Sequence, residues 1–125
     1  MGKDRVWLSM VVCILSLLLA GKASAGQWAK TYGGTGDDEA TSIRQTADGG
    51  YIVAGVTDPL LTGDYDFWVL KLDEAGAVQW QKSYGGTTDD YATSIQQTAD
   101  GGYIVAGTSD SFGARQSEAW VLKLD

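Results

Sequence analysis

The chain has 125 residues, a formal net charge of −7 and no histidine, and its single cysteine is Cys13. Without histidine, general acid/base catalysis by imidazole and Ser-His-Asp triads are excluded. Zinc and copper sites also lose their usual ligands. The acidic balance disfavours nucleic acid and anionic lipid as partners, because both carry negative charge.

The first 25 residues have the pattern of a secretory leader. Lys3 and Arg5 precede an apolar run over residues 6–20, and a small-residue stretch ends at Ala25. This pattern predicts a signal peptide over residues 1–25, cleavage after Ala25, and secretion to the periplasm or the extracellular space. The alternative is an uncleaved membrane anchor, but 15 apolar residues are fewer than the roughly 20 that a spanning helix needs.

The predicted mature chain, residues 26–125, retains no cysteine and so forms no disulfide. Loss of the leader leaves 6 basic and 15 acidic residues, a net charge of −9. The acidic residues are spread along the chain, which indicates a solvated surface rather than an acidic interaction arm. Its length allows one small domain.

The mature chain consists of an internal repeat. Residues 27–73 recur 52 positions later as residues 79–125, with 31 of the 47 positions identical and no gap. This predicts two tandem repeats, 27–78 and 79–125. A repeat of this length usually forms one supersecondary unit that buries its apolar face against its neighbours.

Each repeat divides at turn residues into short β-patterned segments, with no helix expected after the leader. Residues 40–46 end at a hairpin signal, the structural turn Asp48-Gly49-Gly50. Residues 51–55 are apolar on both faces, as in a central strand covered on both sides. Gly55 at its end lets a backbone or a bulky ring approach closely.

The third and fourth segments follow the divergent stretch 58–66. Residues 67–72 place Trp68, Leu70 and Leu72 on one face. Residues 78–84 carry Val78, Trp80 and Tyr84 on their apolar side. In the second repeat, the first three segments correspond to residues 92–98, 103–107 and 119–124, and the turn and the glycine correspond to Asp100-Gly101-Gly102 and Gly107. The fourth segment, residues 78–84, corresponds to the expected strand Gln27–Tyr32.

Four short antiparallel strands in about 50 residues are typical of a β-propeller blade. The predicted fold is therefore all-β, with two four-stranded antiparallel propeller blades after the leader. A β-sandwich and a stacked β-solenoid are the alternatives, and solenoid coils are commonly about half this length.

The string TADGGYIVAG, present twice, resembles the exported bacterial and archaeal propeller-repeat proteins with DGGYIVAG and WVLKLD units. The resemblance covers residues 27–125 and implies a propeller. Residues 46–50 are similar to the Asp-box hairpin of sialidase-like propellers, where the aspartate pins a turn. Residues 72–80 are similar to the tryptophan-docking repeat of quinoprotein propellers. Neither likeness brings a catalytic residue, and such folds host unrelated functions.

Carboxylates are the remaining candidates for chemistry, and we expect no enzyme. Asp37, Asp38, Asp89 and Asp90 lie in glycine-rich loops and offer oxygen ligands to calcium, although each pair alone supplies too few. The competing interpretation is turn formation by aspartate side chains. A glycosidase needs two carboxylates at a fixed separation across a cleft, and the sequence fixes none.

Ligand binding has two candidate locations. The tryptophans Trp28, Trp68, Trp80 and Trp120 offer faces for sugar stacking, but repeated inward tryptophans more often pack between blades. The divergent loop offers Asp64 and Tyr65 in one repeat and Phe112 and Arg115 in the other. Loops on a rigid scaffold carry recognition.

Two blades are fewer than the 4 to 8 that close a propeller. The strand Gln27–Tyr32 of one molecule is placed to complete the blade that ends at Asp125 of another, and two to four copies would supply a ring. We therefore expect a secreted, non-enzymatic binding module for carbohydrate or cell-surface material, acting as a homo-oligomer. The alternative is a truncated part of a larger propeller protein, or of a secreted hydrolase, without activity of its own.

Overall fold

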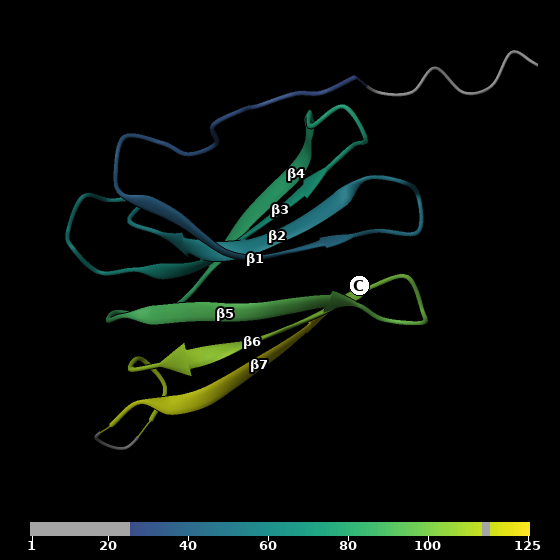
Figure 1. Ribbon diagram of the computed structural model, residues 1–125. Helices are drawn as coiled ribbons and strands as arrows, with labels where there is room; N and C mark the ends of the chain where they lie inside the picture. Colours follow the sequence, from purple (N-terminus) through teal and green to yellow (C-terminus); the bar gives the residue numbers. More distant parts are fainter. Residues whose placement is uncertain (1–25, 114–115) are drawn as a thin grey trace, which may run out of the picture.

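The computed structural model describes residues 26–113 and 116–125. Within them, the chain forms seven β-strands in two antiparallel sheets and no helix (Figure 1). The predicted all-β class is therefore confirmed. No helix among these residues is long and apolar enough to cross a membrane. The predicted signal peptide, residues 1–25, lies outside the described residues.

The first sheet is a meander of four strands, β1 (Asp38–Gln45), β2 (Tyr51–Thr57), β3 (Asp66–Leu72) and β4 (Val78–Tyr84). Each strand pairs with the next along the chain. Gly49 and Gly76 close two of its hairpins at φ 87° and 78°, a conformation that glycine adopts without strain. The predicted segments of this repeat are confirmed to within two residues.

The second sheet repeats the first three strands as β5 (Asp90–Gln97), β6 (Tyr103–Ser109) and β7 (Glu118–Leu124). Its register is that of the first sheet: Gly107 faces Trp120 as Gly55 faces Trp68. No fourth strand pairs with β7 in the described part of the chain. One edge of this sheet is therefore open.

The core lies between the two sheets, which pack face to face (Figure 1). The second sheet approaches the first most closely through β5, which lies against β1, β2 and β3. The first sheet contributes Ile52, Ala54, Phe67 and Val69 to this core, and the second contributes Ala92, Ile95, Tyr103 and Val105.

The prediction that the central strands are covered on both sides holds for β2, which is buried from Ile52 to Thr57. It is wrong for β6, where Ile104 is 40% exposed. The reason is that no third sheet covers the outer face of the second sheet within the described residues.

A β-bulge interrupts the pairing of β3 with β4. Lys71 pairs with Trp80 and Leu72 with Val78, so Gln79 is the extra residue. A bulge changes the side to which the following residues point. Trp80 therefore packs against the core, whereas Val78 is 44% exposed. The prediction that Val78 shares the apolar side of Trp80 is wrong for this reason.

The prediction that Gln27–Tyr32 forms a strand is also wrong for the single chain. These residues run along the first sheet and belong to neither sheet (Figure 1). An outer strand of a meander needs the third strand of its own sheet as a hydrogen-bonding partner. For Gln27–Tyr32 that strand would belong to a preceding sheet, and the described residues contain none.

Candidate assembly interface

An aspartate at the first hairpin turn of each repeat joins three strands. Asp48 accepts hydrogen bonds from the Thr46 hydroxyl and, at 3.0 Å, from the Gly50 amide. Its other oxygen lies 2.9 Å from the Lys71 ammonium. These hydrogen bonds and the ammonium hold the pKa of Asp48 well below its usual range. The second repeat has the same arrangement in Thr98, Asp100, Gly102 and Lys123.

The two equivalent lysines differ in how completely they are enclosed. The Lys71 residue is 3% exposed, and its ammonium also donates to the Leu72 carbonyl and to the Gln79 side-chain oxygen, both at 3.0 Å. Lys123 keeps the bonds to Asp100 and to the Leu124 carbonyl. No described residue supplies a hydrogen bond in place of Gln79, and the exposed Asp125 carboxylate lies 3.7 Å from the ammonium. The Lys123 side chain is 41% exposed.

Aromatic rings fill the seam between the two sheets. The Phe67 ring, fully buried, lies 4.6 Å from that of Trp120. A Cβ added to Gly107 would overlap the Tyr91 carbonyl and meet Phe67 Cζ at 2.7 Å. The prediction that this glycine admits a backbone and a ring is therefore confirmed. Trp80 reaches from β4 to Tyr103 of the second sheet, with ring centroids 5.9 Å apart.

The segment Gln27–Tyr32 lies against the first sheet as β4 lies against the second. Trp28 meets Tyr51 at 5.9 Å between ring centroids, the same separation as between their counterparts Trp80 and Tyr103. Three side chains anchor the segment to the β3–β4 turn. The Trp28 indole, the Lys30 ammonium and the Tyr32 hydroxyl donate to the carbonyls of residues 74, 75 and 76 at 3.3, 2.9 and 2.7 Å.

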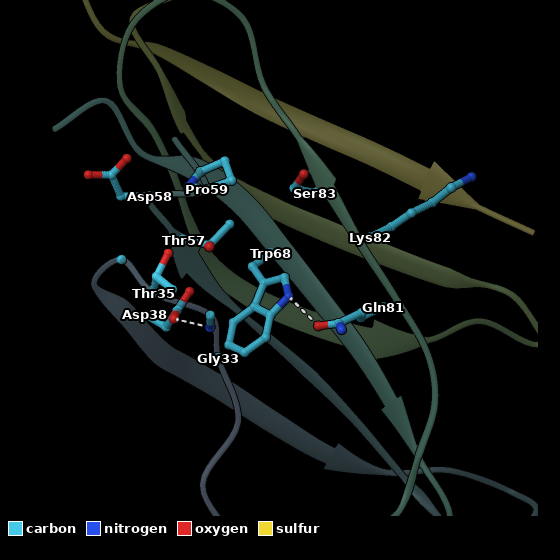
Figure 2. Close-up of a pocket in the computed structure, with 12 residues that line it drawn as sticks. Gly33, Thr35, Asp38, Thr57, Asp58, Pro59, Trp68, Gln81, Lys82 and Ser83 are labelled. Carbon is cyan, nitrogen blue, oxygen red and sulfur yellow. Dashed lines mark hydrogen bonds between the residues drawn. The ribbon is translucent and has the colours of Figure 1, made fainter. Parts of the chain in front are cut away.

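The face of the first sheet that points away from the core is also apolar. As predicted, Trp68, Leu70 and Leu72 share this face, and they cluster there with Val53. A cavity of about 480 Å³ opens beside Trp68. Figure 2 shows the indole, which donates to Gln81 at 3.1 Å, between the loop that leads to Asp38 and the end of β4.

The corresponding space around Trp120 is filled by the first sheet. Phe67 packs on the Trp120 ring, and the Asp66 carboxylate reaches Gly85, the counterpart of Gly33 in the cavity wall. The cavity beside Trp68 thus lies where a third strand would lie if another sheet preceded the first.

The outer face of the second sheet corresponds to the core-facing side of the first. Ile104 and Val121 are 40% and 57% exposed, whereas their counterparts Ile52 and Val69 are fully buried. The second sheet therefore exposes the counterpart of the first sheet's core-facing side, whereas on the first sheet the Trp68 cluster is buried and has a cavity beside it. The two faces are not identical, because Ala119 stands where the first repeat has Phe67 and Thr108 stands where it has Val56.

Two carboxylates from different sheets meet at the seam. Asp90 is fully buried, and its Oδ2 accepts from the Gly86 amide at 2.9 Å and from the Ser111 hydroxyl at 2.8 Å. Asp66 lies across Gly85 from it. Burial, followed by the charge of Asp90, raises the pKa of Asp66.

Asp37 and Asp89 lie directly before β1 and β5, and Asp38 is the first residue of β1. Asp38 accepts from the Gly34 amide at 2.8 Å, and Asp89 from the Tyr65 amide at 3.0 Å. Asp37 accepts the Asp58 amide through its backbone carbonyl. No group of three or more potential ligand side chains in the described part of the chain is arranged to hold a metal ion.

The predicted ligand residues do not converge on one site. Tyr65 packs on Tyr91 at the seam, with ring centroids 5.7 Å apart, and the charge of Asp37 raises the pKa of its hydroxyl. Phe112 covers Trp120 at 4.9 Å. Asp64 is exposed, and Arg115 lies outside the described residues.

Sequence reasoning missed Lys71 and Gln79. The alternation of β3 carried a signal, since it places Lys71 on the same face as Phe67 and Val69. A lysine on a core-facing side needs buried partners. Gln79 gave no such signal, because its role depends on the bulge.

A scan of protein-family models finds no match to the chain, and a search of curated proteins finds none either.

Proposed function

We propose that this chain is a secreted, non-enzymatic binding module, and that its two sheets are β-propeller blades completed by further copies of the same chain. One observation carries the proposal. The outer face of the second sheet exposes Ile104 and Val121, the counterparts of the buried Ile52 and Val69, and the space beside Trp68 that corresponds to the filled space beside Trp120 is an open cavity. A head-to-tail contact between copies would cover both, as heterologous interfaces in closed rings do.

The chemistry of these faces supports association. The cluster of Val53, Trp68, Leu70 and Leu72 matches the aromatic and aliphatic character of a protein interior. The outer face of the second sheet exposes Ile104 and Val121, and exposed apolar faces usually mark interaction surfaces. Two to four copies would supply the four to eight blades of a propeller, and three copies would supply six.

Carbohydrate or other cell-surface material is the ligand class that we propose. Export through the predicted leader would bring the protein to such material. The negative charge of the mature chain makes polyanions poor ligands. The sequence resemblance to exported propeller-repeat proteins supports the same setting.

The test is the solution mass of the mature protein, residues 26–125, measured by light scattering at several concentrations. A mass of two to four chains is expected, and a stable folded monomer would overturn the ring. A glycan array then tests the ligand class, with binding and no hydrolysis as the expected result.

The open edge of β7 favours one second candidate, a part of a larger propeller protein or secreted hydrolase that has no activity of its own. It predicts that residues 26–125 fold poorly alone. Soluble, cooperative folding would contradict it. Calcium at Asp37, Asp38, Asp89 or Asp90 would appear as an increase in thermal stability that EDTA reverses.

A further inference from the structure

We propose that the copies are joined by strand exchange: Gln27–Tyr32 of one copy adds to β7 of the next as the fourth strand of its second sheet. In that position, the Gln27 side-chain oxygen accepts a hydrogen bond from Lys123. The inference rests on the proposed homo-oligomer, and it names the segment and the residue that the second copy contributes.

The donor segment is already held where an outer strand belongs. Trp28 contacts Tyr51 as Trp80 contacts Tyr103, and three hydrogen bonds fix the segment along the β3–β4 turn. Its backbone pairs with no strand of residues 26–113 and 116–125. Little conformational entropy is therefore lost when it pairs with a new partner, because the segment is preorganised.

The acceptor edge lacks what this segment carries. Lys123 has each partner of Lys71 except the side-chain oxygen supplied by Gln79, and its additional neighbour, the exposed Asp125 carboxylate, lies at 3.7 Å, beyond hydrogen-bonding distance. Gln27 is the counterpart of Gln79 in the repeat. The Lys123 site is thus incomplete until a second copy contributes this residue.

A groove beside the acceptor edge has room for the strand. It measures about 520 Å³, and its walls are the core-facing side of β4, including Trp80 and Tyr84, and the end of β7 at Lys123 and Leu124. An incoming strand would cover the Trp80 and Tyr84 rings in this wall and pair with the free backbone groups of β7, which is the usual mode of β-augmentation.

The internal pairing fixes the register of the exchange. Val69 faces Lys82 across β3 and β4, so Val121 of one copy should face Lys30 of the other. Directly opposed antiparallel residues have Cα atoms about 4.5–5.5 Å apart, within the range that a disulfide spans. The mature chain has no cysteine of its own.

Mature protein with Lys30→Cys and Val121→Cys should form disulfide-linked multimers under mild oxidation, seen on a non-reducing gel. Both positions are exposed in the chain. The control pair Lys30→Cys and Ala119→Cys is two residues out of register, roughly 7 Å along the strand, and should lose the cross-link. Equal cross-linking of both pairs, or a link within one chain, would overturn the exchange.

Light scattering on the same samples separates the two proposals. An oligomer without the in-register cross-link would overturn strand exchange and leave the ring standing. A monomer without the cross-link would overturn both.

A matched pair of variants tests the glutamine. Gln27→Leu should raise the dissociation constant of the assembly about tenfold, because it removes an acceptor from a charged donor, and should leave the stability of the dissociated chain unchanged. Gln79→Leu should instead destabilise the dissociated chain. An unchanged dissociation constant for Gln27→Leu would overturn the assigned contact.

Discussion

The seam between the sheets can be tested with Phe67→Ala. The Phe67 side chain is fully buried and packs on Trp120. Large-to-small substitution of a buried phenylalanine costs about 3–5 kcal/mol, as lost burial plus a residual cavity. A domain of this size has a free energy of unfolding of about 5–15 kcal/mol, so this variant should lose about a fifth or more of its stability.

The assays are urea and thermal denaturation of residues 26–125, both followed by tryptophan fluorescence, at a concentration where the chain is dissociated. The melting temperature should fall by more than about 12 °C, since 1 kcal/mol corresponds to about 4–8 °C in a domain of up to 100 residues. Phe112→Ala is the matched control, because that ring contacts the same tryptophan but is 58% exposed. Its cost should stay below about 1 kcal/mol. Equal losses for the two variants would refute the assignment of the seam.

Five further substitutions have defined outcomes. Gly107→Ala should destabilise the chain by about 1–3 kcal/mol in the same urea assay, because the added methyl group overlaps a backbone carbonyl. Lys71→Met should lower the free energy of unfolding by about 1–3 kcal/mol, and Lys123→Met, at a partly exposed site, should lower it by less. The reverse order would contradict the enclosure of Lys71. The pKa of Asp48 is lowered by folding, so its contribution to stability is present above its ordinary value of 3.8 and is lost as the pH falls through the folded value. Asp48→Asn should therefore flatten the acid limb of stability against pH. The effect of Asp66 on stability is opposite to that of Asp48, because folding raises the pKa of Asp66. Asp66→Asn should therefore stabilise the chain at pH 7, and this gain in stability should vanish in acid. A loss of stability at pH 7 would contradict the electrostatic account.

Much of the fold could be predicted because the same local turn and strand patterns occur at equivalent positions of both repeats. The glycine pair after each aspartate and the alternation of the third strand are local patterns, and both led to strands in the right places. The behaviour of Val78 could not be predicted, because it depends on a bulge that only cross-strand pairing reveals. Gln27–Tyr32 has the sequence pattern of a strand, but a strand also needs the free edge of a sheet as its hydrogen-bonding partner. The sequence pattern does not show which sheet edges are free.

The candidate interface was less predictable than the strands. The tryptophans were expected to pack between sheets, and Trp80 and Trp120 do. Tyr65 was expected in a recognition loop, whereas its ring packs on Tyr91 at the seam. A loop residue next to a strand end can serve either role, and only the position of the neighbouring sheet decides between them.

The string Tyr-Ile-Val-Ala-Gly occurs in both central strands, yet solvent reaches the two copies differently. Ile52 is sealed on its face of the first sheet, while Ile104 is 40% exposed. Local opening starts where few apolar contacts hold a strand, so backbone amides of β6 should exchange with deuterium sooner than those of β2. Two identical pentapeptides would then differ in amide exchange rate within one molecule. The difference would measure how much of a strand's resistance to local opening comes from the sheets packed against it.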